Sequence, residues 1–82
     1  MSKSLIETLA DMEFKWVATD NEWVIYEKPG NGYNEVVSVA VNASDGAVTI
    51  DRRVIDSDDT SLWINMNQSD PVIEVILSHF VQ

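Results

Sequence analysis

The spacing of hydrophobic and polar positions changes along this chain, and each spacing predicts a different element. Leu5, Leu9 and Met12 recur at i, i+4 and i+7, so they form one apolar stripe of a helix. Ser4 followed three residues later by Glu7 is a capping box, which is typical of a helix start. We therefore expect a short helix at the beginning of the chain. After it, the spacing changes to the period of two that is typical of β-strands.

The segment 14–27 predicts a β-hairpin whose tight turn lies at residues 20–21 (Asp-Asn). In that register Trp23 lies opposite Ala18, and Ile25 lies opposite Trp16. We expect both tryptophans to be part of the core. The side chains predicted to share one face are Phe14, Trp16, Trp23 and Ile25. After this hairpin, residues 28–31 (Lys-Pro-Gly-Asn) match a type II turn, in which glycine supplies the positive φ.

A second hairpin has the cleanest alternation in the chain. Alternate valines point to one face of the segment 35–42, and Val48 and Ile50 do the same in the segment 48–54. Asp45-Gly46 marks the turn between them. A two-residue loop and a four-residue loop remain as alternatives, and both bring the two stripes together because their registers differ by two residues. We expect this valine stripe to be the centre of the core.

The last third of the chain predicts a loop and a second helix. Residues 56–60 read as a solvated acidic loop, and residues 61–66 are either a fifth strand or an irregular approach to the helix. Residues 68–71 (Gln-Ser-Asp-Pro) form a helix start, with cap residues followed by proline in the first turn. The helix that follows is apolar over a broad face, which predicts deep packing. That face comprises Val72, Ile73, Val75, Ile76, Leu77 and Phe80.

Together these elements predict one α+β domain over residues 1–82. It has two layers: an antiparallel sheet of four to five strands built from two hairpins, and the N-terminal and C-terminal helices packed on its apolar face. We expect the opposite face of the sheet to be mixed in character. It carries Val17, Val24 and Tyr26 beside Lys15, Thr19, Glu22, Ser38, Thr49, Asp51 and Arg53.

The charge of the chain limits its partners. Fourteen Asp and Glu face five Lys and Arg, for a net charge of −9. This balance disfavours direct binding to nucleic acid or to anionic membranes, because both need clustered cations. It favours basic surfaces. The chain has no cysteine, no apolar run near the ~18 residues of a membrane span and no signal peptide at its start, so we expect a cytoplasmic protein.

The sequence offers little catalytic chemistry. There is no cysteine nucleophile, and the one histidine, His79, lies near the end of the last helix, where it suits the helix dipole. The acidic run 56–60 has an alternation that suits calcium, but Ser61 and Asn67 stand where an EF-hand needs Gly and Glu. We therefore expect no enzyme activity, no metal site and no cofactor.

Two surface features remain as candidates for binding. By alternation, Arg53 points away from the valine stripe, whereas Arg52 lies on the valine side at the sheet margin, where it pairs with Glu35 or a C-terminal carboxylate. Tyr26 and Trp63 are aromatic residues of the kind that anchor interfaces. The predicted partner-binding residues are Val17, Val24, Tyr26, Arg53 and Trp63.

The opening of the chain carries a resemblance. A short helix, then Phe14-Lys15-Trp16, then the run 20–28 that ends in Tyr26-Glu27-Lys28, resembles small uncharacterised proteins of Gram-positive bacteriophages and mobile elements. The resemblance implies the helix, strand-pair and closing-helix layout, and no activity.

From these features we expect a non-enzymatic, acidic interaction module that binds a protein partner through the mixed sheet face. The alternative is a DNA mimic, whose carboxylates replace phosphates in the groove of a nucleic-acid-binding protein. Self-association through an apolar patch is a further possibility for such a surface.

Overall fold

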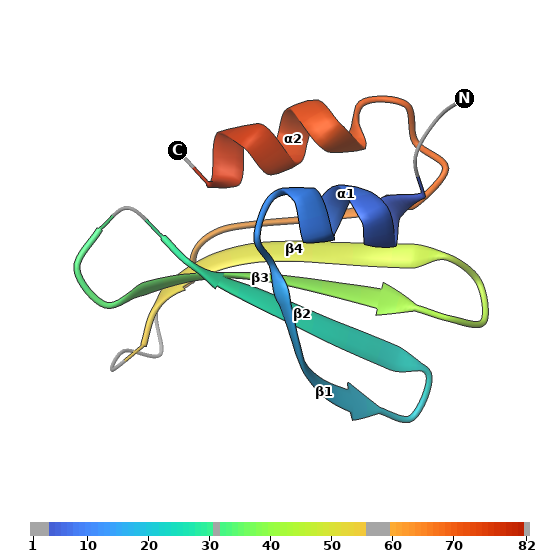
Figure 1. The fold of residues 1–82 in the computed structure, drawn as a ribbon, viewed down its shortest axis with the longest axis horizontal. Helices are drawn as coiled ribbons and strands as arrows, with labels where there is room; N and C mark the ends of the chain where they lie inside the picture. Colours follow the sequence, from blue (N-terminus) through green and yellow to red (C-terminus); the bar gives the residue numbers. More distant parts are fainter. Residues whose placement is uncertain (1–3, 31, 56–59, 82) are drawn as a thin grey trace.

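The protein has two layers, a five-stranded antiparallel sheet and a pair of helices that lie on one face of it (Figure 1). The computed structural model describes residues 4–30, 32–55 and 60–81. The strand order is β1-β2-β3-β4-β5. The α+β prediction is confirmed, and residues 61–66 belong to a fifth strand. In chain order the elements are α1 (Leu5–Asp11), β1 (Lys15–Asp20), β2 (Trp23–Pro29), β3 (Glu35–Asn42), β4 (Ala47–Val54), β5 (Thr60–Asn67) and α2 (Ile73–Phe80).

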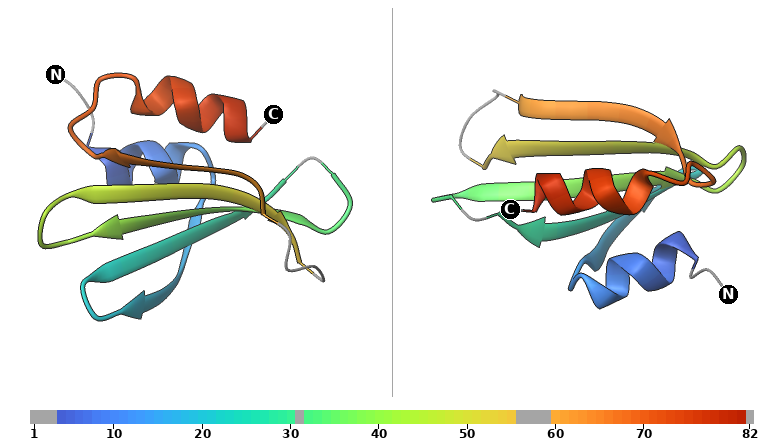
Figure 2. Two further views of the ribbon diagram at one scale, coloured as in Figure 1. Left: turned by 180° about the vertical axis from the view of Figure 1, so that it is seen from behind. Right: turned by 90° about the horizontal axis from the view of Figure 1, so that it is seen from above.

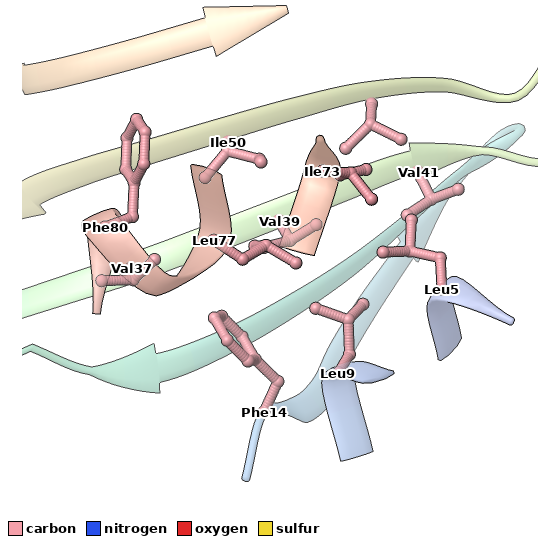
Figure 3. Packing of buried hydrophobic residues seen from close by; sticks show 11 residues of the cluster. Leu5, Leu9, Phe14, Val37, Val39, Val41, Ile50, Ile73, Leu77 and Phe80 are labelled. Atoms are coloured by element: carbon pink, nitrogen blue, oxygen red, sulfur yellow. The ribbon is translucent and has the colours of Figure 1, made fainter. Parts of the chain in front are cut away.

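The core lies between the helices and the central strands β3 and β4. Val39 and Ile50 are direct cross-strand partners, and both are 0% exposed. Leu77 of α2 and Leu9 of α1 point toward them from the helix layer (Figure 3). Burying a side chain of this size stabilises a fold by about 1.5–3 kcal/mol. The predicted valine stripe is therefore confirmed as the centre of the core, which comprises Leu5, Leu9, Phe14, Val37, Val39, Val41, Val48, Ile50, Ile73, Leu77 and Phe80.

The N-terminal helix begins as its sequence predicts. The Ser4 hydroxyl accepts a hydrogen bond from the Glu7 backbone N–H (3.2 Å) and donates one to the Glu7 carboxylate (3.3 Å). The helix ends through Glu13, whose φ of 70° turns the chain back. The Phe14 N–H then bonds to the Leu9 carbonyl (2.9 Å), so the first strand starts directly beneath the helix.

The C-terminal helix buries less of its surface than the sequence predicts. The Asp70 side chain accepts a hydrogen bond from the Val72 N–H (3.1 Å), and the helix proper starts at Ile73. Ile73, Leu77 and Phe80 are buried, but Val72 and Val75 are exposed. The prediction of a broad packed face is therefore wrong for these two valines. A short helix that lies on a single sheet has only one side in contact with the core.

The second hairpin has the four-residue loop, residues 43–46, because Val41 pairs with Val48. The Asn42 side chain accepts hydrogen bonds from the N–H groups of Ser44 (2.8 Å) and Asp45 (3.3 Å). Gly46 closes the loop with a φ of 77°. Its position requires glycine, because most other residues are strained at a positive φ.

The first hairpin departs from its prediction in register and in facing. Asp20 pairs with Trp23, so the turn is Asn21-Glu22, and Asn21 takes the positive φ of 55°. Pairing with β3 then fixes the facing of β2, because Val24 lies opposite Val41 and Tyr26 lies opposite Val39. Both partners are buried under the helices. Val24 and Tyr26 therefore lie on the helix side, and the prediction that Trp23 and Ile25 share the core face is wrong.

Trp16 is also misplaced by the sequence-based prediction. The register of β1 shifts between Trp16 and Ala18, and this β-bulge places Trp16 opposite Tyr26. Because β1 is an edge strand with a neighbour on one side only, Trp16 is 59% exposed. Its N–H donates to the Thr19 hydroxyl (3.0 Å). Trp16 therefore does not belong to the core.

The connection between the hairpins differs from the predicted type II turn. Strand β2 continues through Pro29, and the Gly30 N–H bonds to the Glu35 carbonyl (2.9 Å). The left-handed backbone conformation lies at Asn34 (φ 56°) rather than at Gly30. Residue 31 of the predicted turn lies outside the described residues. The chain reverses where expected, over a longer loop.

Candidate functional site

The candidate site is the sheet face that points away from the helices, which we call the open face. In the described part of the chain, no helix or strand lies over it (Figures 1 and 2). The strand pairing brings its side chains into rows across the sheet. One row crosses all five strands, and we call it the polar row: Lys15, Glu27, Ser38, Asp51 and Trp63. The adjacent row comprises Ala18, Ile25, Ala40, Thr49 and Asn65.

Arg53 ties the centre of the polar row together. Its guanidinium contacts the Glu27 carboxylate (3.1 Å) and the Asp51 carboxylate (3.1 Å), and it donates to the Ser38 hydroxyl (2.9 Å). The Ser38 hydroxyl in turn donates to Glu27 (3.1 Å). Three strands contribute to the network, since Glu27 is on β2, Ser38 on β3, and Asp51 and Arg53 on β4. The result is a fixed polar network rather than a set of mobile surface charges.

The network has one positive and two negative groups, and its partial burial shifts the pKa of one of them. Burial raises the pKa of the Asp51 carboxyl above its usual value of 3.8, and the nearby Glu27 charge adds to this increase. The Arg53 guanidinium lowers the same pKa by its charge and its hydrogen bond. Keeping the Asp51 carboxylate ionised therefore costs free energy. A partner bound to this face would remove more water from the carboxylate and increase that cost.

A hollow of about 240 Å³ lies next to the network, at the end of the sheet where β2 finishes and β3 begins. Ile55 and Val17 at the hollow are exposed, at 61% and 46%. Its lining is mainly apolar surface with charged residues among it, a combination that suits an apolar side chain of a partner. The lining residues are Lys15, Val17, Glu27, Lys28, Pro29, Glu35, Val36 and Ile55.

The structure divides the five predicted partner-binding residues between the two faces. Arg53 and Trp63 lie in or beside the polar row, and Val17 lines the hollow, so these three share the open face. Val24 and Tyr26 lie on the helix side, where Tyr26 packs against the core. The predicted patch of Val17, Val24 and Tyr26 therefore does not exist.

The sequence-based reasoning missed Glu27 and Ile55. Glu27 directly follows Tyr26, so placing Tyr26 on the correct face would have placed Glu27 on the other. Ile55 lies just beyond the predicted strand, and its exposure is not readable from alternation. For Glu27, the missing information was the pairing of β2 with β3.

The remaining candidates lie elsewhere. Arg52 is on the helix side and pairs with Glu35, whose carboxylate is 3.7 Å from its Nε, as predicted. His79 is exposed in the last turn of α2. The calcium hypothesis concerned residues 56–60, of which 56–59 lie outside the described residues. The residues that are described contain no group of three or more His, Asp or Glu side chains that could hold a metal ion.

Neither helix in the described ranges has the length and apolar character needed to cross a membrane. No protein family, no curated protein and no solved structure matches this chain. The geometry of the open face is therefore the basis for assigning a function.

Proposed function

We propose that this chain is a non-enzymatic interaction module that binds a partner protein with its open face. The observation that supports this proposal is the juxtaposition of the hollow with the Arg53 network. Apolar pockets beside polar groups held in place are the usual centre of a protein interface. Here the polar groups are positioned before binding, since Arg53 already contacts Glu27, Ser38 and Asp51. Binding therefore orders few additional side chains.

The charge of the chain supports a basic partner. A net charge of −9 attracts cationic surfaces and accelerates their encounter. On the open face, Lys15 and Arg53 balance the charges of Glu27 and Asp51, so the attraction to a basic partner comes from the acidic chain as a whole. We propose that an apolar side chain of the partner enters the hollow while basic residues surround it. Such binding weakens as salt screens the charges.

A pair of isoleucines allows a matched test. Ile55 at the hollow is 61% exposed, and Ile6 on α1 is 57% exposed on the opposite layer. Ile55→Asp and Ile6→Asp therefore make the same chemical change at similar exposure. The tagged chain and both variants are used for capture from lysate at low and high salt, with quantitative mass spectrometry.

The proposal predicts a protein that the wild type and Ile6→Asp retain at low salt and that Ile55→Asp loses by tenfold or more. If every captured protein is retained equally by both variants, the open face is not the binding surface. If the captured protein binds DNA and added DNA displaces it, the chain acts as a mimic of nucleic acid. Circular dichroism of each variant confirms that it is folded.

A further inference from the structure

The last strand, β5, forms an edge of the sheet that carries no charge. Its eight residues, Thr60–Asn67, include no Asp, Glu, Lys, Arg, Pro or Gly, although the whole chain has nineteen charged residues (14 acidic and 5 basic). Edge strands usually carry charge, proline or a bulge, because their unpaired backbone groups otherwise pair with other chains. Strand β5 is the outermost strand beside β4, with no described element beyond it (Figure 2).

The register of β5 shows which backbone groups point outward. The Gln68 N–H bonds to the Gly46 carbonyl (2.8 Å), and these residues continue the pairing of Ala47 with Asn67. In an antiparallel ladder, hydrogen-bonded pairs alternate with pairs whose N–H and C=O groups point away from each other. Counting from Gln68, Trp63 and Asn65 belong to the second kind. Their backbone N–H and C=O groups therefore face the open edge.

The opposite edge of the sheet is protected. Strand β1 carries Lys15 and Asp20, and its register is interrupted by the bulge between Trp16 and Ala18. Charges and bulges both interfere with the addition of another strand. The register of β5 also shifts once, at its start opposite Arg52 and Arg53, but the stretch from Leu62 to Asn67 pairs with β4 without interruption and carries no charge. Of the two edges of the described sheet, this stretch of β5 therefore has the character of a pairing surface.

The core is also incomplete on the β5 side. Helix α2 contacts β4 and β5, and α1 lies toward β1 (Figure 2). Ile64 and Met66 of β5 point toward the helix side but are only half-buried. A strand added beside β5 would extend the sheet and cover these two side chains.

We propose that β5 pairs with β5 of a second copy of this chain, antiparallel about a two-fold axis at Ile64, so that one ten-stranded sheet runs through the dimer. In this register, Trp63 of one copy and Asn65 of the other form hydrogen-bonded pairs on the open-face side. The two Ile64 side chains meet on the helix side. A sequence that pairs with itself in this way gives a closed, symmetric interface.

A second copy fits this edge better than a foreign strand for reasons of charge. A charged strand from another protein would find no opposite charge on β5. The β5 strand of a second copy is uncharged and apolar on one side, so it matches this edge. The net charge of −9 on each copy opposes their association. The proposed contact is made by an uncharged strand, so the charged side chains are not brought into direct contact by β5 itself. The dimer should therefore strengthen as salt screens the repulsion. This salt dependence is opposite to that of the proposed partner binding, so the two proposals can fail independently.

Sedimentation velocity of the untagged chain tests the proposal over about 1 μM to 1 mM, a range that covers weak and moderate dimers. The expected species has twice the 9.2 kDa mass of the chain. Asn65→Lys places a charge on the open edge and should return the chain to a monomer. Thr19→Lys is the matched control on β1 and should leave the dimer intact. Each substitution removes one exposed side-chain hydrogen bond, to Thr49 or to Trp16.

Disulfide trapping tests the register, because the chain has no cysteine of its own. At the two-fold axis, the Cα atoms of the two residues 64 would be about 4.5 Å apart, as in a non-hydrogen-bonded pair, which lies within the range for a disulfide. Ile64→Cys should therefore form a covalent dimer on mild oxidation, and Asn65→Cys should do so more slowly. A wild type that remains monomeric throughout, or an Asn65→Lys variant that remains dimeric while folded, overturns the proposal. Faster trapping through Asn65→Cys overturns the axis at Ile64.

Discussion

The two faces of the sheet use neighbouring residues of the same strands for different purposes. On β3 and β4, Val39 and Ile50 are fully buried under the helices, whereas Ala40 and Thr49 beside them lie on the open face. The centre of the covered face is apolar, and its burial provides most of the stability. The open face carries a charged network and an apolar hollow, both outside the core cluster. The open face, whose network and hollow lie outside the core, is the face that we propose for binding.

The largest difference between the faces should appear on truncating their central residues. Ile50→Ala on the covered face should lower the free energy of unfolding by about 2–5 kcal/mol, since it leaves a cavity in the core. Thr49→Ala on the open face removes only a hydrogen bond to Asn65 (2.9 Å) and should cost about 0.5–1.5 kcal/mol. Urea denaturation of both variants measures this ratio. Equal losses would mean that the open face contributes to folding as much as the core does.

The second comparison concerns two aromatic residues that the sequence suggested as interface anchors. Tyr26 packs against the core, whereas Trp63 is 64% exposed. Tyr26→Ala should therefore cost about 2–4 kcal/mol of stability, and Trp63→Ala less than about 1 kcal/mol. Thermal unfolding of the two variants tests the assignment. If Tyr26→Ala were more stable than Trp63→Ala, Tyr26 would lie on the open face and the facing assigned to β2 would be wrong.

A smaller effect is expected at the centre of the polar row. Arg53→Met keeps the aliphatic stem but leaves Glu27 and Asp51 without their shared cation, so we expect a loss of about 1–2 kcal/mol at neutral pH. Arg53→Lys retains the charge but contacts fewer groups, so its stability should lie between those of the wild type and Arg53→Met. Chemical denaturation measures both. Stability equal to wild type in Arg53→Met would show that solvent already screens the network.

The smallest effect is a pH dependence at Asp51. Because burial raises the pKa of its carboxyl, the folded state binds this proton more tightly than the unfolded state does. The wild type should therefore gain stability relative to Asp51→Asn as the pH falls through the raised pKa, and the gain should be complete below the usual value of 3.8. Parallel unfolding curves from neutral pH to the acidic limit measure the difference. A difference that stays constant or shrinks on acidification would contradict the raised pKa.

The sequence predicted the covered face of the second hairpin because Val37, Val39 and Val41 recur at every second position, as do Val48 and Ile50. In β2 the run from Trp23 to Tyr26 is apolar on both sides, so alternation could not decide which side faces the helices. That choice depends on pairing with Val39 and Val41, which are distant in sequence. The same pairing brings Glu27 to Arg53. The side of Arg53 was thus predictable, but its partners and the hollow were not.

The central claim is that the open face binds and the helix layer does not. Hydroxyl-radical footprinting of the chain alone and in the complex purified after capture compares Val17 and Ile55 with Ile6 and Val75, all of which are exposed in the isolated chain. The account predicts protection of Val17 and Ile55 in the complex and unchanged labelling of Ile6 and Val75. Protection of Ile6 and Val75, with Val17 and Ile55 still labelled, would contradict it.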